Sequence, residues 1–416
     1  MTKMYDINKR LIVDSWRLVA NNDGAAGIDK LTIAEIQKDY KGYLYTLWNR
    51  MSSGSYMASP VRKVTIPKAD GKERILGIPT VLDRVAQMAA VKTVSERIDG
   101  KFHEDSYGYR PKKSAHQAIG KAKERCYRYP WVVDLDIQSF FDTIPHDQMM
   151  EMVERRIEEP WIKLYIKRWL KAEMMDAKGN VTSRELGTPQ GGVISPLLAN
   201  MYLDEAFDWW INQAFPRVKF ERYADDIIIH CNSKIEAQEV LDQVRERMSE
   251  YGLTLHPEKT KIIYCKSKGR NLSYPNVTFT FLGYQWKPRS AIERTNGKLR
   301  LAFTPAVSTK AQQKIRNTIR SWKLNEKTHV ELKTIATTFN KRLQGWIAYY
   351  GQHRKSELGQ SLKYLDERLV QWIRKKHKIK SYARAWDKLK ATKQTNPKLF
   401  AHWFIPINST ITRRAV

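Results

Sequence analysis

The chain has 416 residues, and its 73 Lys and Arg against 44 Asp and Glu give a formal net charge of +29. The hydrophobic content of 42%, with 20 Tyr, 13 Trp and 12 Phe, excludes an intrinsically disordered chain, so the excess charge must lie on folded surfaces. This length indicates more than one domain, and the basic excess favours a polyanionic partner.

The cysteines and the chain start indicate where the protein works. Cys126, Cys231 and Cys265 never form a C-x-x-C pair, which argues against a disulfide framework and against a Cys-rich zinc site. The first ten residues are polar and charged, and no stretch reaches the ~18 apolar residues of a membrane span. We therefore expect a cytoplasmic protein with no membrane partner.

Strand and helix patterns alternate over the first 300 residues. Short β-branched or aromatic runs predict strands at 61–67, 131–137, 220–229 and 260–265. Longer patterns between them predict helices at 81–99, 147–172, 196–213 and 234–251. This part of the chain is therefore expected to be an α+β catalytic region.

The last 116 residues differ in both pattern and charge. They hold 25 Lys and Arg against 6 Asp and Glu, which is about two thirds of the whole excess. Apolar residues recur at steps of three and four along 332–350 and 362–372, which predicts helices that pack together and leave basic side chains outward. The basic density peaks at Arg374, Lys375 and Lys376, and five Trp lie in the same region. We expect an all-helical domain that contacts RNA phosphates through these side chains; a merely solvated charged face is the alternative.

Paired aspartates point to metal-dependent chemistry. Asp225 and Asp226 are adjacent between apolar runs, where they would repel each other unless a cation lies nearby. Asp134 and Asp136 share one face of the strand at 131–137 because side chains alternate along a strand. Aspartate oxygens without neighbouring His or Cys favour magnesium over zinc, and two such ions support nucleotidyl transfer or its nuclease reverse. For an isolated Asp-Asp pair, a turn or helix cap is the alternative.

Three motifs then identify a family. The chain contains D-I-Q-S-F-F-D at 136–142, G-T-P-Q-G-G-V-I-S-P-L-L-A-N at 187–200 and Y-A-D-D at 223–226. In this order they resemble the reverse transcriptases of bacterial group II introns, also called intron maturases, and the resemblance runs from about residue 24 to residue 350. It implies an α+β right-hand polymerase with fingers and an antiparallel-sheet palm, followed by an all-helical basic thumb or maturase domain.

The resemblance also implies a division of the chain. Residues 1–40 would form an amino-terminal extension with a template-covering loop, and 41–290 the fingers and palm. Residues 291–385 would form the helical thumb or maturase domain, and 386–416 a short basic and aromatic segment in place of an H-N-H endonuclease domain.

Catalytic roles follow from the same resemblance. Asp136, Asp225 and Asp226 would converge within a few ångströms and hold two Mg²⁺ ions, with the backbone carbonyl of Ile137 as a further ligand. Lys259 would be the general acid for pyrophosphate, with a plain exposed lysine as the alternative. Asp134 fits this set less well and is expected to be structural.

Substrate contacts are implied as well. The residues expected to bind the nucleotide are Lys68, Arg74, Phe141 and Gln190, and those expected to bind template or primer are Arg110, Gly191, Leu282 and Gly283. Among them, Phe141 would exclude a ribose 2′-hydroxyl and so favour dNTPs, while its neighbour Phe140 would belong to the core. Arg110 would contact a template phosphate.

The implied function is RNA-directed DNA polymerisation from a primer 3′-hydroxyl, coupled to splicing and retrotransposition of a group II intron. The implied partners are intron RNA in a ribonucleoprotein, an RNA template with a DNA primer, target DNA and dNTPs; a homodimer stays open. Two alternatives remain at this point. One is a related reverse transcriptase redeployed for antiviral defence or DNA repair, and the other is an RNA-binding splicing cofactor with a vestigial polymerase.

Overall fold

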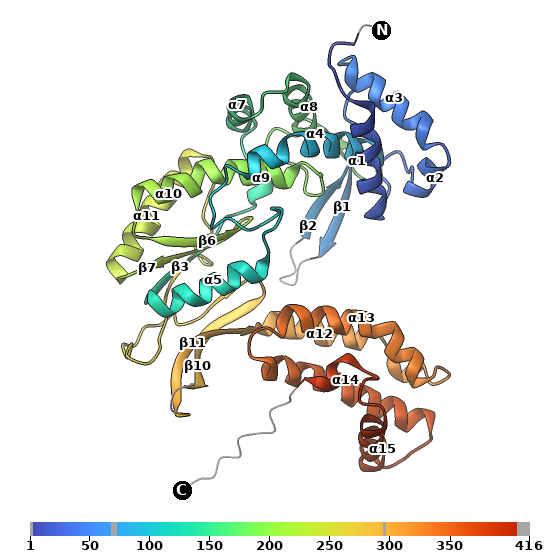
Figure 1. Ribbon diagram of the computed structural model, residues 1–416, viewed down its shortest axis with the longest axis vertical. Helices are drawn as coiled ribbons and strands as arrows, with labels where there is room; N and C mark the ends of the chain where they lie inside the picture. Colours follow the sequence, from blue (N-terminus) through green and yellow to red (C-terminus); the bar gives the residue numbers. More distant parts are fainter. Residues whose placement is uncertain (1–2, 68–72, 294–296, 406–416) are drawn as a thin grey trace. The chain divides into compact units, whose positions relative to one another are not determined.

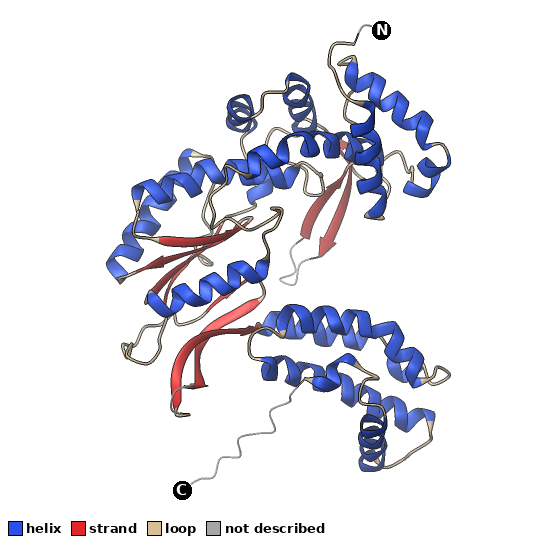
Figure 2. Cartoon of the chain, in the orientation of Figure 1, coloured by secondary structure: helices blue, strands red, loops and turns tan. Residues whose placement is uncertain are grey.

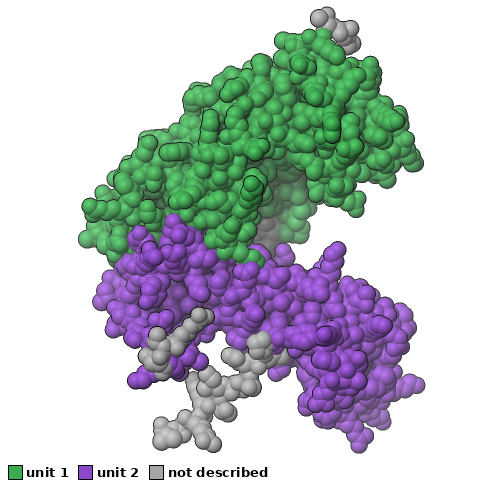
Figure 3. Space-filling view, in the orientation of Figure 1, with its two compact units in different colours: residues 1–118, 133–262 green, residues 119–132, 263–416 purple. Residues whose placement is uncertain are grey.

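The computed structural model describes residues 3–67, 73–293 and 297–405. The chain divides into two compact units, residues 1–118 with 133–262, and residues 119–132 with 263–416 (Figure 3). The division falls at residue 262, whereas the boundary expected near residue 290 lies inside strand β10 (Tyr284–Ile292).

The first unit alternates helices and strands (Figure 1). Its helices are α1 (Lys9–Asn21), α2 (Ile33–Lys38), α3 (Tyr40–Ser52), α4 (Val81–Asp99), α6 (Phe140–Thr143), α7 (His146–Arg156), α8 (Pro160–Leu170), α9 (Ser195–Leu203), the π-helical turn η1 (Asp204–Asp208), α10 (Trp209–Ala214) and α11 (Lys234–Glu250). Its strands are β1 (Val61–Pro67), β2 (Glu73–Ile78), β4 (Met174–Met175), β5 (Val181–Thr182), β6 (Lys219–Tyr223) and β7 (Asp226–Cys231). Helix α5 (Ala115–Arg128) and strands β3 (Trp131–Asp136) and β8 (Lys261–Tyr264) contribute residues to both units.

Two sheets position the site. Strands β1 and β2 pair antiparallel from Arg62↔Ile78 to Pro67↔Glu73 and form a hairpin. This hairpin belongs to a sheet of order β2-β1-β4-β5, in which β1 and β4 run parallel. The second sheet has the order β6-β7-β3-β8, with β6 and β7 antiparallel. The predicted strand at 220–229 is therefore two strands joined by a tight turn.

Two predicted helices depart from a regular α-helix. The helix expected at 147–172 breaks between α7 and α8, because Pro160 lacks the N–H that would continue the hydrogen-bond ladder and instead begins a new helix. The helix expected at 196–213 is continuous from α9 to α10 but contains the π-helical turn η1. A π turn often marks a functional site, and this one contributes two buried aspartates.

The second unit joins a small sheet to helices (Figure 2). The sheet has the order β11-β10-β9 and consists of β9 (Phe279–Phe281), β10 (Tyr284–Ile292) and β11 (Leu299–Val307). The helices are α12 (Thr309–Ser321), η2 (Leu324–Glu326), α13 (Leu332–Tyr350), α14 (Lys355–Lys376), α15 (Tyr382–Thr395) and η3 (Ala401–Phe404). Both apolar repeats predicted from the sequence lie on helices, α13 and α14.

Apolar side chains from these helices form one core. Leu343, Leu365 and Leu369 are fully buried in it. The Trp322 ring stacks on Phe339 at 4.1 Å between ring centroids and faces Trp346 at 5.9 Å. Trp346 is therefore a packing residue, and the fold as a whole confirms the predicted mixture of antiparallel sheets and helices with an all-helical end. Among the described helices, none is long and apolar enough to be a candidate membrane span.

Truncating a buried leucine tests this core. We expect Leu365→Ala to lower the free energy of unfolding by about 2 to 5 kcal/mol, because a fully buried leucine leaves a cavity. Leu272→Ala is the matched control, since Leu272 is 62% exposed and its truncation should cost under about 0.5 kcal/mol. Thermal unfolding of the full chain measures both. Equal effects of the two substitutions would contradict the assignment of Leu365 to the core.

The second stability prediction concerns pH. His402 is buried, and its Nε2 lies 3.0 Å from Asp366 Oδ1. Burial lowers the pKa of His402, although the Asp366 carboxylate opposes this shift. Between the folded pKa and about 6.5 the unfolded state binds more protons, so stability falls as the pH drops through this window, by at most about 1.4 kcal/mol per pH unit.

We expect His402→Gln to reduce this slope, measured as the urea-unfolding free energy between about pH 7 and 5. His146 and His377, whose pKa values burial also lowers, stay in the variant and contribute to the remaining slope, while buried carboxylates with raised pKa values such as Asp134 oppose it. An unchanged slope would show that His402 titrates alike in both states.

Candidate active site

The two aspartates of Y-A-D-D lie on a strained turn. Tyr223 pairs with Asp226, so Ala224 and Asp225 form a two-residue connection between β6 and β7. Ala224 has φ +57°, a left-handed conformation that costs a residue other than glycine about 1 kcal/mol or more. Asp225 therefore lies at the tip of the hairpin, and Asp226 begins β7.

Asp136 ends the neighbouring strand β3. Its carbonyl oxygen accepts a hydrogen bond from the backbone N–H of His256 at 2.7 Å, and Ile137 bridges to Leu255. The Asp136 side chain forms an ion pair with Lys259, 3.1 Å from Nζ to Oδ2, with 42% and 58% of the two side chains exposed. Because both partners are exposed, the pair adds little stability, and the Lys259 ammonium group can leave it at small cost.

These carboxylates repel one another. Burial raises the pKa of Asp225, and the charge of Asp136 raises it further. The guanidinium groups of Arg74 and Arg222 oppose this shift. Burial also raises the pKa of Asp134 well above its usual value, and the charges of Asp226 and Asp136 raise it further. Burial and the neighbouring carboxylates therefore both make a negative charge on Asp134 and Asp225 unfavourable unless a cation lies nearby.

A cleft of about 820 Å³ gathers most of the predicted site residues of the first unit. The predicted residues that line it are Arg74, Asp136, Ile137, Phe141, Gln190, Asp225 and Lys259. A smaller adjoining pocket of about 220 Å³ shares Arg74, Phe141 and Gln190 with it and adds Gly191. Segments more than a hundred residues apart in the sequence thus contribute to one cavity.

Gln190 joins two walls of this cleft. Its Oε1 accepts a hydrogen bond from Arg74 Nε at 2.7 Å, and its Nε2 donates to Asp142 Oδ2 at 2.9 Å. The next residue, Gly191, has φ +130°, and a Cβ at this position would lie 2.8 Å from the carbonyl oxygen of Gly77. Only glycine fits there, so the backbone after Gln190 lies close against β2.

Phe140 and Phe141 have the exposures that the resemblance implies. Phe140 is 2% exposed, whereas Phe141 is half-buried and lines both cavities. The carbonyl oxygen of Phe141 accepts a hydrogen bond from the backbone N–H of Thr188 at 2.7 Å, which fixes the main chain beside the cleft. Phe141 is therefore the ring that a nucleotide sugar in the cleft could meet.

The donor set suits magnesium in its chemistry. Asp136, Asp225 and Asp226 offer only carboxylate oxygens, which hard divalent cations prefer, and the raised pKa of Asp225 indicates that a positive charge would be favourable there. Within the described residues, however, no three His, Cys, Asp or Glu side chains gather closely enough to hold a metal ion. The expected convergence is therefore partial: Asp136 and Asp225 share a cleft without a complete ligand cluster.

The surroundings of Arg110 contradict its predicted contact with template phosphate. Its side chain is 6% exposed, and it donates to Asp99 Oδ1 at 2.7 Å and to the carbonyl oxygens of Asp99, His103 and Ser106 at 2.6–2.9 Å. These internal acceptors turn the guanidinium group inward. The preceding residue, Tyr109, is 60% exposed and lines both cavities instead, a position that no sequence pattern distinguished.

The predicted primer-contacting pair lies in the second unit. Leu282 and Gly283 have φ +52° and +77° and form the turn between β9 and β10. The Tyr349 hydroxyl of α13 donates to the carbonyl oxygen of Leu282 at 2.9 Å, and Tyr350 packs against Gly283. The hairpin is thus fixed to a helix of its own unit. Lys68, predicted to bind the triphosphate, lies outside the described residues.

The three predicted RNA contacts at the end of α14 differ in availability. Lys375 is exposed. Lys376 Nζ donates to the carbonyl oxygen of Val330 at 2.9 Å and to Glu331 Oε1 at 2.8 Å, and its side chain is only 17% exposed. Arg374 donates to the carbonyl oxygen of Lys380 at 2.8 Å. Lys376 is therefore a poor candidate for phosphate contact, because its ammonium group is already paired inside the fold.

Family models match most of the chain. Residues 66–286, more than half of the 416, match the model described as reverse transcriptase (RNA-dependent DNA polymerase). Residues 312–392 match the model described as group II intron, maturase-specific domain. The first match covers the cleft and its aspartates, and the second covers α13, α14 and most of α12 and α15.

Curated relatives agree with these matches. The chain is 30% identical over 347 residues to Protein YkfC of Escherichia coli (strain K12), a match covering 74% of this chain and 86% of that protein. It is 36% identical over 180 residues to the group II intron-encoded protein LtrA of Lactococcus lactis subsp. cremoris, covering 43% of this chain and 29% of LtrA. It is 26% identical over 311 residues to the putative COX1/OXI3 intron 1 protein of Saccharomyces cerevisiae, covering 60% and 37%.

The chain thus spans most of one relative and well under two thirds of the other two. The matches, the fold and the cleft agree with one another. The chain belongs to the reverse transcriptase family, as an RNA-directed DNA polymerase followed by a group II intron maturase-specific domain.

Proposed function

We propose that this protein binds a group II intron RNA, assists its splicing, and copies RNA into cDNA from a primer 3′-hydroxyl during intron mobility. The observation that carries the proposal is the cleft in which Asp136, Asp225, Arg74, Phe141 and Gln190 meet. The carboxylates of Asp136 and Asp225, the cations of the cleft and its half-buried aromatic ring are the groups that nucleotidyl transfer to a deoxynucleotide needs.

Asp136, Asp225 and Asp226 would hold two Mg²⁺ ions, with the carbonyl of Ile137 as a further ligand. When bound, the ions would increase the acidity of the primer hydroxyl and stabilise the charge on the leaving pyrophosphate. The chain's own contribution is the position of the carboxylates, since Asp225 is held at a hairpin tip and Asp136 at the end of a clamped strand.

Two cations of the cleft would contact the phosphates of the nucleotide. Arg74 is exposed at the start of β2, and its Nε contacts the side chain of Gln190, so its guanidinium group lies at the nucleotide-binding wall. Lys259 would move from Asp136 toward the leaving pyrophosphate and donate its proton from Nζ. Lys68, which falls outside the described residues, would join Arg74 in binding phosphate.

The second unit, residues 119–132 with 263–416, contains helices α12 to α15 and is called the helical unit; it would bind the RNA. It carries most of the excess positive charge, and it includes the part of the chain that matches the maturase-specific domain. Exposed cations such as Lys375 would contact phosphates, whereas the stacked rings of Trp322, Phe339 and Trp346 form the core beneath them. The relative LtrA is a group II intron-encoded protein, which supports intron RNA as the polyanion.

Removing one carboxylate tests the polymerase. We expect Asp225→Asn to lower the rate of DNA synthesis on an RNA template by at least about 10³-fold, because several kcal/mol of metal-dependent stabilisation is lost. RNA affinity, measured by filter binding, should stay within about twofold, since the helical unit is unaltered and phosphate contacts dominate affinity.

The control for this experiment is Asp242→Asn, an exposed aspartate on α11 with 51% of its side chain accessible. It should extend primers like the wild type. A wild-type protein that extends no primer with dNTPs and Mg²⁺ would contradict the polymerase proposal and leave splicing assistance as the remaining function. An Asp225→Asn variant of full activity would contradict the role proposed for Asp225.

Sugar selection gives a second test. We expect Phe141→Ala to raise the use of NTPs relative to dNTPs by about 10- to 100-fold, because removing the ring opens space for the ribose 2′-hydroxyl. The ratio of kcat/KM for an NTP and the matching dNTP measures this effect, and dNTP incorporation by the same variant is the internal control. An unchanged ratio would exclude Phe141 as the selecting residue.

A further inference from the structure

A buried ion pair lies directly beneath the catalytic turn. Arg222 and Asp208 are both inaccessible to solvent, and the guanidinium group donates to both carboxylate oxygens of Asp208, at 2.7 and 2.5 Å. Arg222 is the last residue but one of β6, and Asp208 ends the π-helical turn η1. Neither side chain can reach substrate, and the chemistry described above uses neither of them.

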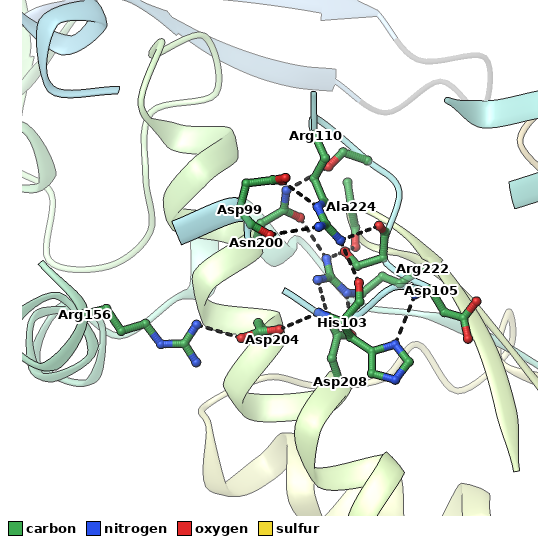
Figure 4. Close-up of polar contacts among 12 residues, drawn as sticks. Asp99, His103, Asp105, Arg110, Arg156, Asn200, Asp204, Asp208, Arg222 and Ala224 are labelled. Carbon is green, nitrogen blue, oxygen red and sulfur yellow. Dashed lines mark hydrogen bonds and ion pairs between the residues drawn. The ribbon is translucent and has the colours of Figure 1, made fainter. Parts of the chain in front are cut away.

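The same guanidinium group extends to the turn itself. Arg222 Nη1 donates to Asn200 Oδ1 at 2.9 Å and to the carbonyl oxygen of Ala224 at 3.3 Å (Figure 4). Ala224 is the residue with φ +57° that immediately precedes Asp225. A strained residue persists only where its surroundings hold it in place, and Arg222 supplies a fixed donor at that point.

A second contact supports the turn from its other side. Asn200 Nδ2 donates to the carbonyl oxygen of Gly108 at 2.8 Å. A Cβ at Gly108 would lie 2.4 Å from the backbone nitrogen of Ala224 and 2.9 Å from the carbonyl carbon of Tyr223, so the bare backbone of Gly108 packs against the turn. Asn200 thus links the two sides, contacting Arg222 through its oxygen and Gly108 through its nitrogen.

The segment before Gly108 is fixed to β6 as well. The backbone N–H of Arg222 donates to the carbonyl oxygen of Asp105 at 3.0 Å, and that of Tyr107 donates to the carbonyl oxygen of Arg222 at 2.8 Å. The inward-facing Arg110 holds the same segment through the carbonyl oxygens of His103 and Ser106. The position of Gly108 relative to the turn is therefore determined by several independent bonds.

The π-helical turn explains how two distant residues reach one guanidinium group. Asn200 and Asp208 are eight residues apart, and along a regular α-helix of 3.6 residues per turn they would drift around the axis. The wider turn of η1, with i→i+5 hydrogen bonding, counteracts this drift. Both side chains therefore face β6 and contact Arg222.

From this arrangement we infer that Arg222, Asp208 and Asn200 are positioning residues that fix the Ala224–Asp225 turn and so set where the Asp225 carboxylate lies. The inference rests on the proposed polymerase function and deepens it. A buried ion pair adds little stability compared with an apolar pair of equal volume, but it fixes geometry, which is what a carboxylate at a reaction centre needs.

The main test removes both charges together, since removing one would leave an unpaired buried charge. We expect Arg222→Met with Asp208→Leu to lower kcat for dNTP addition by about 10²-fold, the loss typical of a misplaced reacting group. KM for the dNTP should change by less than about threefold, because Arg74, Phe141 and Gln190 lie outside the network.

The matched control is Arg156→Met with Asp204→Leu. Asp204 begins η1 and Arg156 ends α7, and the pair is closely bonded, 2.7 Å from Arg156 Nη1 to Asp204 Oδ2, with Asp204 fully buried. Of the described residues around it, Asp204 contacts the backbone of His103 but neither Ala224 nor Gly108. The Arg156/Asp204 control variant should lose about as much thermal stability as the Arg222/Asp208 variant, while its kcat should stay within about threefold of the wild type.

A conservative variant separates positioning from simple support. Arg222→Lys keeps the positive charge opposite Asp208, but a single ammonium group cannot bond Asp208, Asn200 and Ala224 together. It should keep more of the wild-type stability than of the wild-type kcat, because the charge pair remains while the bonds to the turn are lost. If Arg222 only stabilised the fold, kcat and stability would return together, and the inference would be wrong.

Hydrogen exchange at residues 223–227 measures the turn without any need for activity. Exchange there should increase in the Arg222/Asp208 variant and stay at the wild-type level in the Arg156/Asp204 control. If exchange increases only in the Arg222/Asp208 variant but the wild type is inactive, the polymerase proposal is rejected and the positioning role is kept. If the wild type is active and both double variants show equal exchange and equal kcat, the positioning role alone is rejected.

If the Arg222/Asp208 variant shows no cooperative unfolding, it is not folded and its kcat cannot be compared. The Gly108→Ala variant then tests the positioning of the turn. The new methyl group would press on the Ala224 nitrogen while leaving every charge in place, so kcat should again fall about 10²-fold. Wild-type kcat in both Gly108→Ala and Arg222→Lys would overturn the inference.

Discussion

The crowding of carboxylates at one edge of the β6-β7-β3-β8 sheet is the constraint on which the rest of this structure depends. Asp136 ends strand β3 and Asp225 lies on the turn between β6 and β7, and the charge of Asp136 adds to the effect of burial in raising the pKa of Asp225. Protein cations compensate only in part, through Lys259 at Asp136 and through Arg74 and Arg222 near Asp225. An edge of this kind has a strong preference for added positive charge, which is the physical basis for assigning divalent metal ions to it.

The cations near this edge divide into two kinds. Lys259 and Arg74 are exposed, and their single contacts to Asp136 and Gln190 can be exchanged for phosphate oxygens at little cost. Arg222 is fully buried and makes four hydrogen bonds with good geometry, so it cannot move without leaving Asp208 unpaired. Exposed cations suit a changing substrate, and a buried cation suits a fixed frame.

Local patterns predicted the elements, and tertiary context decided the rest. The strand at 61–67 and the helix at 81–99 have the expected bounds, because alternation and capping are encoded nearby in the chain. The break before Pro160 divides the helix predicted at 147–172, although a proline inside a helical pattern is itself a signal for such a break. Arg110 was predicted to contact template, yet its neighbour Tyr109 lines the cleft and Arg110 turns inward, because the acceptors of Arg110 include residues that no local pattern pairs with it. No local pattern distinguishes Arg222 either, since its partner Asp208 looks like an ordinary polar position on an amphipathic helix.

Internal acceptors also limit what net charge can predict about RNA binding. In the helical unit, Lys376 is paired with Glu331, Lys393 with Asp366 and Arg289 with Glu357, so these cations offer less to a polyanion than the composition suggests. Each pairing orders part of the fold and lowers the number of phosphates the surface can neutralise. Since the salt dependence of RNA affinity reports that number, it should follow the exposed cations and not the formal charge of +29. Charge counted along a sequence therefore indicates which unit we expect to bind a polyanion, while burial and pairing indicate which of its side chains remain available for that contact.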